Sequence, residues 1–283
     1  MSGRPLIAIG AAAAVISAGL VAMSVTGAPT ALVVLQGVAG LVGLGLGGVI
    51  AAQSPDPRGR GAMAAVGLAL AALAATLFFA GTDGVHRWIA LGPVQFLPSA
   101  VALPILVWFA VARPTGWAGP AVVILAAAFC AAQPDTQAVG ALFAAVATLV
   151  LLGMWRPPWL LALAACLIAG IVAAFAPPLE PVAYVEQVVP LAFEAGPVFG
   201  LVAVAGLIGV PATILLASWG RFGPTTAAMV ALWLIFCAAS LSGTLPTPVI
   251  GFGLSWVLGF GLSLGLVAGS GHRRPRDTPP HTP

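Results

Sequence analysis

The sequence predicts an all-α fold: a polytopic transmembrane helical bundle of about ten spans, with both termini in the cytoplasm. The first observation is compositional, because 61% of the 283 residues are hydrophobic and 6% are charged, with a mean hydropathy of +1.12. A soluble domain carries about 25% charged residues, so this composition fits a lipid environment. The second observation is the length of the apolar runs, which lack the alternation of strands. Helices satisfy all their backbone polar groups within lipid and need roughly 20 residues to cross it.

Gly, Pro and charged residues divide the chain into ten apolar segments. The expected spans are residues 5–26, 31–52, 62–80, 96–112, 117–132, 137–154, 159–176, 192–217, 224–242 and 249–269. The first run is longer than the apolar core of a signal peptide, so we expect a span there and not a cleaved signal. Pro98, Pro104 and Pro120 interrupt the fourth and fifth segments, which neighbouring helices can tolerate. We expect residues 1–270 to form one transmembrane domain and residues 271–283 a disordered cytoplasmic tail.

The arginines predict the orientation, because cytoplasmic loops of membrane proteins are enriched in basic residues. With ten spans and a cytoplasmic N-terminus, all but one of the arginines fall on the cytoplasmic side. These are Arg4, Arg58, Arg60, Arg113, Arg156, Arg221, Arg273, Arg274 and Arg276. Arg87 alone falls on the outer side, and losing or adding one helix would scramble this pattern.

Carboxylates show the opposite distribution and gather on the predicted outer face. Five of the seven fall there, namely Asp83, Asp135, Glu180, Glu186 and Glu194, together with Arg87 and His86, whereas Asp56 and Asp277 fall on the cytoplasmic side. One interpretation is that outer loops simply need polar residues, and the other is an outward-facing polar site. Glu194 favours the second, because it lies within an apolar run and ionisable groups at membrane depth are costly. No metal-binding spacing or nucleotide-binding motif accompanies these residues, so we expect no resident cofactor, although a divalent cation is compatible with the site.

Three segments of the predicted outer face carry more specific patterns. They are G-T-D-G-V-H-R-W-I-A-L-G-P-V-Q-F-L-P-S from Gly81, Q-P-D-T from Gln133, and L-P-T-P-V-I-G-F-G-L-S from Leu245. These segments resemble, in order and spacing, motifs of the FtsW/RodA/SpoVE (SEDS) family of bacterial cell division and shape proteins. The matching residues are Gly84, Arg87, Trp88, Ile89, Leu91, Gly92, Pro93, Pro98 and Ser99, then Gln133, Pro134 and Asp135, then Pro248, Phe252, Gly253 and Ser255.

The resemblance implies a multi-pass protein of the bacterial cytoplasmic (inner) membrane that acts in peptidoglycan synthesis during division or elongation. Members of the family are glycosyltransferases that polymerise the lipid-linked precursor lipid II on the outer face of that membrane. They usually act with a penicillin-binding transpeptidase. The implied partners are therefore a lipid-linked cell wall precursor, such a transpeptidase or another division protein, and membrane lipid, with no nucleic acid.

The resemblance also assigns candidate site residues. The catalytic aspartate of the family aligns with Val185, next to Glu186, and Glu194 matches another acidic position, so Glu186 and Glu194 are the catalytic candidates. The candidates for substrate binding are Arg87, Trp88, His86, Asp135 and Ser255. For Arg87, the expected phosphate partner, the alternative is an anchor at the membrane interface beside Trp88. For Asp135 it is a helix cap.

The chain departs from the family pattern at Val185, at Ala100 and Leu97 in the first motif, and in a short loop over residues 176–190. The sequence therefore leaves open whether the chain is an enzyme. A peptidoglycan glycosyltransferase is one prediction. The alternatives are a non-catalytic membrane scaffold that binds a partner and a transporter of a lipid-linked precursor.

Overall fold

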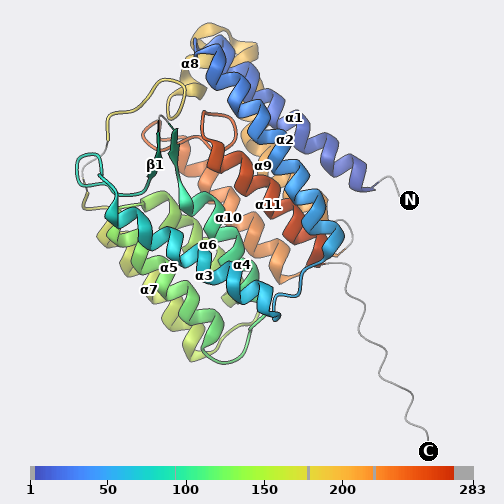
Figure 1. Cartoon of the computed structure of the whole chain (residues 1–283), viewed down its shortest axis with the longest axis vertical. Coiled ribbons are helices and arrows are strands. Elements are labelled where there is room, and N and C mark those ends of the chain that lie inside the picture. The colour runs from blue at the N-terminus through green and yellow to red at the C-terminus, as the bar shows by residue number, and fades with distance from the viewer. Residues whose placement is uncertain (1–3, 93, 177–178, 219–220, 271–283) are drawn as a thin grey trace, which may run out of the picture.

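The protein, seen here in a computed structural model, is described over residues 4–92, 94–176, 179–218 and 221–270. Within these ranges each predicted apolar segment contains one long helix, and one of them also takes in the end of a short helix, so the all-α prediction is confirmed (Figure 1). The long helices are α1 (Arg4–Val25), α2 (Thr30–Gln53), α3 (Arg60–Ala75), α4 (Pro98–Val111), α5 (Ala118–Ala132), α6 (Thr136–Leu151), α7 (Pro157–Ala173), α9 (Pro197–Ser218), α10 (Pro224–Ser240) and α11 (Leu254–Ser270). The predicted tail over residues 271–283 lies outside the described residues.

Four of the described helices are long and apolar enough to cross a membrane by themselves: Leu6–Val25, Thr30–Gln53, Arg60–Phe78 and Pro197–Ser218. The other long helices have 14 to 17 residues. At 1.5 Å per residue, 16 residues cover about 24 Å, against roughly 30 Å for the hydrocarbon core. The apolar helices support a membrane protein, and the number of complete spans stays a prediction.

The predicted span over residues 192–217 is wrong as a single helix. The chain instead forms a short helix, α8 (Val188–Ala195), and then α9. The Gly196 amide bonds back to Ala192 and Phe193, and Pro197 then opens α9. A residue before proline is pushed away from the helical conformation, while proline itself suits the first helical position. Gly196–Pro197 therefore separates the two helices.

Two further differences lie at the same end of the bundle. The strands β1 (Ile89–Leu91) and β2 (Val94–Phe96) pair antiparallel as a hairpin, with Leu91 opposite Val94. Three-residue strands are too short for hydrophobic alternation to reveal. The last helix begins at Leu254 and not at residue 249, because the preceding residues form a hydrogen-bonded loop. A 3-10 turn, η1 (Thr76–Phe78), follows α3 directly and is the one such turn among the described residues.

α2 and α11 pack against each other through glycines spaced four residues apart on each helix. Gly43 and Gly47 of α2 face Gly261 and Gly265 of α11, and a Cβ atom on any of them would meet backbone atoms of the opposite helix. Small residues with this spacing let two helix backbones approach closely. The first part of the chain is thereby joined directly to its last helix.

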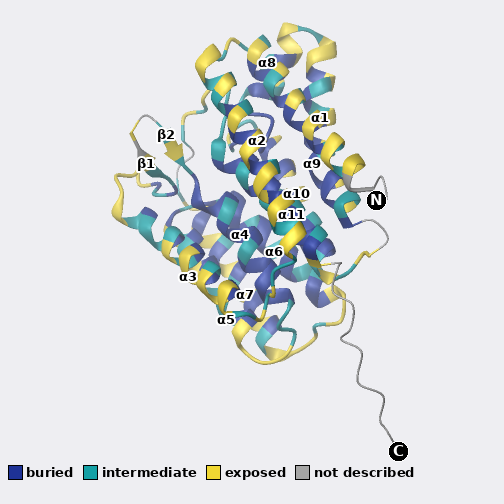
Figure 2. Ribbon diagram, turned by 45° about the vertical axis from the view of Figure 1, so that its right-hand side comes forward, coloured by how far each residue is buried: buried dark blue, intermediate teal, exposed yellow. Residues whose placement is uncertain are grey.

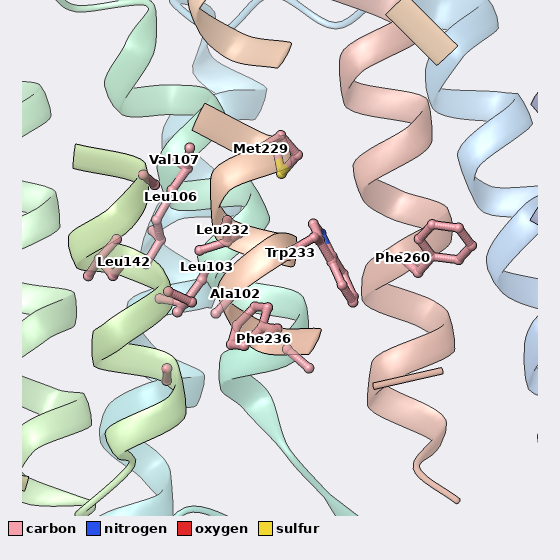
Figure 3. Close-up of a cluster of buried hydrophobic side chains, with 14 of the residues drawn as sticks. Ala102, Leu103, Leu106, Val107, Leu142, Met229, Leu232, Trp233, Phe236 and Phe260 are labelled. Carbon is pink, nitrogen blue, oxygen red and sulfur yellow. The ribbon is translucent and has the colours of Figure 1, made fainter. Parts of the chain in front are cut away.

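The core lies among α4, α6, α10 and α11, where Figure 2 shows mainly buried residues, while the outer helices carry exposed apolar side chains. Leu103 and Leu106 of α4 meet Leu142 of α6 and Leu232 of α10 in one cluster (Figure 3). Next to it, the ring of Trp233 contacts Phe236, Trp256 and Phe260 edge to face, with centroids 5.5 to 6.0 Å apart. Rings in this geometry add to the stabilisation from burial.

The two ends of the bundle differ in charge. At one end, which we call the arginine-rich end, the α2–α3 and α4–α5 connections are joined by Arg58, which donates to the Ala112 carbonyl, and by Arg113, which donates to the Pro57 carbonyl. Arg156, at the start of α7, is at this end too, because Trp159 donates to the Pro114 carbonyl. The β1–β2 hairpin, with Arg87 before it, lies at the other end of α3 and marks the hairpin end (Figure 1).

Candidate functional site

The three sequence segments with specific patterns come together at the hairpin end. The Leu97 amide, just after β2, donates to the Ser255 hydroxyl at 2.8 Å. Ser99, in the first turn of α4, donates to the Asp135 carboxylate at 2.8 Å. Gln137, in the first turn of α6, donates to the Pro246 carbonyl at 3.0 Å. Residues from distant parts of the sequence thus meet through direct hydrogen bonds.

Asp135 connects two of these segments and begins α6. One carboxylate oxygen accepts the Ala138 amide at 3.1 Å, and the other accepts the Ser99 hydroxyl. Asp135 therefore caps the helix, as the alternative interpretation of the sequence predicted. Asp135 and Ser255 are both almost fully buried, and substrate binding by either of them stays a prediction.

Gln36 holds the α10–α11 loop, which covers residues 241–253. Its side-chain amide donates to the Val249 carbonyl at 3.3 Å and the Gly251 carbonyl at 3.0 Å, and its oxygen accepts the Gly253 amide at 3.1 Å. The side chain is completely buried. Sequence reasoning did not select Gln36, although an isolated amide within an apolar span is the signal that could have found it.

The short segment after α7 is attached to the same loop. The Thr247 amide donates to the Val185 carbonyl at 3.0 Å, and the Phe252 amide donates to the Tyr184 carbonyl at 2.8 Å. The Thr247 hydroxyl donates to the Glu186 carbonyl at 3.3 Å. The α10–α11 loop is therefore bound on one side by α2 and on the other by residues 184–186.

Glu186 is buried within this arrangement, with 8% of its surface exposed. Its carboxylate accepts the Val182 amide at 2.9 Å, which closes a turn within its own segment. Burial raises the pKa of Glu186 above its ordinary value, and the Val182 amide and the charge of Arg87 oppose this rise. Glu186 is therefore easier to protonate than an exposed glutamate.

A cavity of about 300 Å³ opens between the segment that leads into the hairpin, the α5–α6 turn, the end of α7 and the α10–α11 loop. Its lining residues are Val85, Arg87, Pro134, Thr136, Ala173, Ala174, Ala176, Leu179, Thr244 and Leu245. Small and apolar side chains make up most of this lining. Arg87 supplies the charge among these residues, since the remaining polar ones are threonines.

Arg87 is 5% exposed, although it carries a permanent charge. Its guanidinium carbon lies 4.5 Å from the centre of the Trp88 ring, which provides a favourable cation–π contact. Its Nε atom is buried and has no hydrogen-bond partner among the described residues. An unpaired buried donor costs about 1–3 kcal/mol, and more when the group is charged. A guanidinium group in this condition is suited to receive an anionic acceptor.

The remaining predicted residues lie around this cavity or away from it. His86 precedes Arg87, and its Nδ1 atom lies 3.0 Å from the Phe79 carbonyl oxygen. Glu194 is exposed on α8 and does not line the cavity. The structure brings Arg87 and Glu186 near enough for their charges to interact, whereas it leaves Glu194 apart from them. The catalytic roles of both glutamates stay predictions.

Gln133 is a second unsatisfied polar group at the hairpin end. Its Nε2 atom donates to the Leu73 carbonyl at 2.6 Å, but its buried Oε1 atom has no partner in the described chain. It precedes Pro134, which lines the cavity. Within the described ranges, no three His, Cys, Asp or Glu residues gather as ligands for a metal ion.

Comparison of the sequence finds no matching protein-family model and no matching curated protein. Comparison of the structure finds the rod shape determining protein RodA of Thermus thermophilus, with a TM-score of 0.60 and 19% identity over 93% of this chain and 94% of that chain. A mutant of the same RodA gives a TM-score of 0.60 at 20% identity over 93% and 95%. The chain has the RodA fold.

A third similar structure belongs to a peptidoglycan synthase complex described as coordinating polymerization and crosslinking. It gives a TM-score of 0.57 at 20% identity, over 92% of this chain and 95% of that chain. The structural neighbours confirm at the level of fold the resemblance carried by the three sequence motifs.

Proposed function

We propose that this chain is a membrane protein of bacterial cell wall synthesis that binds a lipid-linked diphosphate precursor, such as lipid II, in the cavity beside Arg87. The observation that carries the proposal is the buried guanidinium on the cavity wall, whose Nε atom lacks a partner. The RodA fold supports the pathway, because similar structures are a rod shape determining protein and part of a peptidoglycan synthase complex.

The chemistry of the cavity supports this class of ligand. A phosphate oxygen would supply the missing acceptor, and guanidinium binds phosphate through paired, charge-assisted hydrogen bonds. The volume of about 300 Å³ is at the lower end of the range for small-molecule pockets. This space suits the polar head of the ligand near the diphosphate, with the apolar chain remaining in the membrane.

A glycosyltransferase activity is a second candidate, and Glu186 favours it. Polymerisation requires a base that takes a proton from the attacking hydroxyl, and such help contributes about 10²–10⁴ in rate. Glu186 is a buried carboxylate whose raised pKa brings it nearer to neutral pH.

The third similar structure comes from a complex described as coordinating polymerization and crosslinking. By analogy we propose a penicillin-binding transpeptidase as the partner of this chain. The glycosyltransferase activity is tested by a polymerisation assay with the purified protein, that partner and lipid II.

The binding proposal is tested with purified protein in lipid nanodiscs and lipid II as the ligand. We expect Arg87→Gln to weaken binding at least tenfold, because the variant loses the charge and the paired donors. Arg87→Lys should bind with intermediate affinity, since an ammonium group keeps the charge without the planar fork. Arg156→Gln, an exposed position at the arginine-rich end, should bind as wild type does. Equal affinity of wild type and Arg87→Gln would remove the proposal.

A further inference from the structure

Arg87 and Glu186 form a pair of opposite charges buried at the hairpin end, with 5% and 8% of their surfaces exposed. They belong to different segments that both border the α10–α11 loop. Thr244 and Leu245 line the cavity together with Arg87. Three residues later, Thr247 bonds to the backbone of Glu186. The loop that lines the cavity is therefore hydrogen-bonded to the backbone of Glu186.

The two groups interact through their electric fields without forming an ion pair in the described structure. The Glu186 carboxylate is held by the Val182 amide, and the Arg87 guanidinium lies over the Trp88 ring with its Nε atom unpaired. Each charge is thus fixed by its own neighbours. Arg87 is consequently available to an external anion while it still stabilises the ionised form of Glu186.

A bound anion would change this balance of charge. In its absence, and with Glu186 ionised, the site holds one positive and one negative charge. A phosphate at Arg87 adds negative charge near an ionised Glu186, in surroundings where charge interactions are much stronger than in water. Like charges in one site raise the pKa of a carboxyl group. The site can relieve this repulsion by taking a proton onto Glu186.

We propose that binding of an anion at Arg87 is coupled to the uptake of one proton by Glu186, so that the site binds its ligand more tightly as the pH falls. This inference rests on the proposed anion site and adds its regulation. The bound proton remains on the carboxyl group and leaves when the anion leaves, so no bond of the ligand is broken. Glu186 then responds to the ligand without touching it.

The direction of the effect follows from linkage. Burial already raises the pKa of Glu186 in the free protein, and Arg87 opposes that rise. An anion that neutralises Arg87 removes this opposition, so the pKa of Glu186 is higher in the complex than in the free protein. Binding is therefore strongest at a pH below both pKa values and weakens as the pH rises through them.

The pH dependence expected from Glu186 must be distinguished from that of other ionisable groups in this part of the chain. Tyr184 and the exposed Glu180 lie on its own segment, His86 lies beside Arg87, and Asp135 lies at the α5–α6 turn. The bonded part of the α10–α11 loop presents Thr247 to Glu186 and carries no charge. The side-chain charge that contributes to the pKa shift of Glu186 is that of Arg87.

The test measures lipid II binding in nanodiscs from pH 5.5 to 8.0. Lipid II carries its phosphates as diesters, which stay ionised throughout this range. We expect the affinity of wild type to fall on the order of tenfold from the acid to the alkaline limit, within the usual range of coupling between sites. Glu186→Gln keeps an acceptor for the Val182 amide and should bind with the affinity of the acid limit at every pH. Glu180→Gln, the matched control, should retain the wild-type dependence.

A second measurement does not depend on any variant folding. Calorimetric titrations of wild type with lipid II, in buffers with different ionisation enthalpies, should show uptake of up to one proton per ligand near the midpoint. No proton uptake, or a wild-type pH dependence in Glu186→Gln, would overturn the coupling. A dependence abolished by His86→Gln but kept in Glu186→Gln would assign the proton to His86 and also overturn it.

The two proposals fail in different ways. If Arg87→Gln loses binding and Glu186→Gln keeps the wild-type pH dependence, the anion site stands and the coupling falls. If Arg87→Gln binds as tightly as wild type, the anion site itself falls, and with it the coupling. Loss of pH dependence in both variants, with weak binding only in Arg87→Gln, is the result expected from both proposals together.

Discussion

Asp135 shows how one residue serves both local and long-range structure. It caps α6 through the Ala138 amide and accepts the hydroxyl of Ser99 on α4. Substitution of a capping residue by alanine costs about 1 kcal/mol. Leaving the buried Ser99 hydroxyl unpaired adds roughly 1–3 kcal/mol. The stability of the hairpin end therefore depends on this carboxylate.

We predict that Asp135→Ala lowers the free energy of unfolding by about 2–4 kcal/mol, since both bonds are lost. Asp135→Asn should lose less, because an amide oxygen can still cap the helix. Thermal unfolding of the detergent-solubilised variants measures the difference. Ser99→Ala is the control, because it removes one of the bonds and leaves the cap. An Asp135→Ala protein as stable as wild type would show that the cap contributes nothing.

Residues at the site differ in how visible they are in the sequence. Arg87 and Asp135 could be selected because charged residues are rare in this chain and occur in recognisable patterns. The partners of Gln36 and Gln133 could not be predicted, because neither an isolated amide nor a motif residue reveals which group it binds. Their hydrogen bonds reach Gly251 and Leu73, which are distant in the sequence. Periodicity and composition carry no information about such pairs.

At the scale of the elements, the α2–α11 contact provides a sharp test of packing. On α2, Gly47 faces the backbone of Gly261, whereas the adjacent Gly48 has nothing within 4 Å of an added Cβ atom. The two residues share a helix and a residue type and differ in their surroundings. Substitution by alanine at each position therefore isolates the effect of close approach.

Gly47→Ala should destabilise the protein by about 1–3 kcal/mol, because the methyl group forces two packed backbones apart. Gly48→Ala should be neutral or slightly stabilising, since alanine is the better helix former. The measurement is thermal unfolding of both variants in the same detergent. Equal melting temperatures would contradict close packing between α2 and α11.

The ten long helices could be predicted because apolar runs are a strong signal, whereas their ends could not. Pro197 follows Gly196 and splits one predicted helix, although the apolar character continues through both parts. The β1–β2 hairpin was expected only as part of a loop, because its strands have three residues each. In both cases local turn geometry overrides the hydrophobic pattern.

At the scale of the whole molecule, the charge asymmetry predicts which end faces the cytoplasm. Arg58, Arg113 and Arg156 gather at one end, and Arg87 lies at the other. Basic residues favour the cytoplasmic side. The hairpin end, with the cavity, should therefore face outward.

Cysteine labelling in intact cells measures this orientation. A membrane-impermeant thiol reagent should modify Thr82→Cys, an exposed position at the hairpin end, without breaking the cells. Arg156→Cys should react only after the membrane is made permeable. The native Cys130, Cys166 and Cys237 are buried, so the wild-type protein serves as a low-background control. The reverse labelling pattern would show that the predicted orientation is wrong and that the cavity faces the cytoplasm.

The glycine contact between α2 and α11 has a consequence for biosynthesis. The face of α2 that carries Gly43 and Gly47 packs against a helix that begins about 200 residues later. At a synthesis rate of about 5–20 residues per second, α2 waits roughly 10–40 seconds for that helix to emerge from the ribosome. Until then Gln36 also lacks the loop that it binds. The packing face of α2 therefore gains its partners within the chain only when synthesis is almost complete.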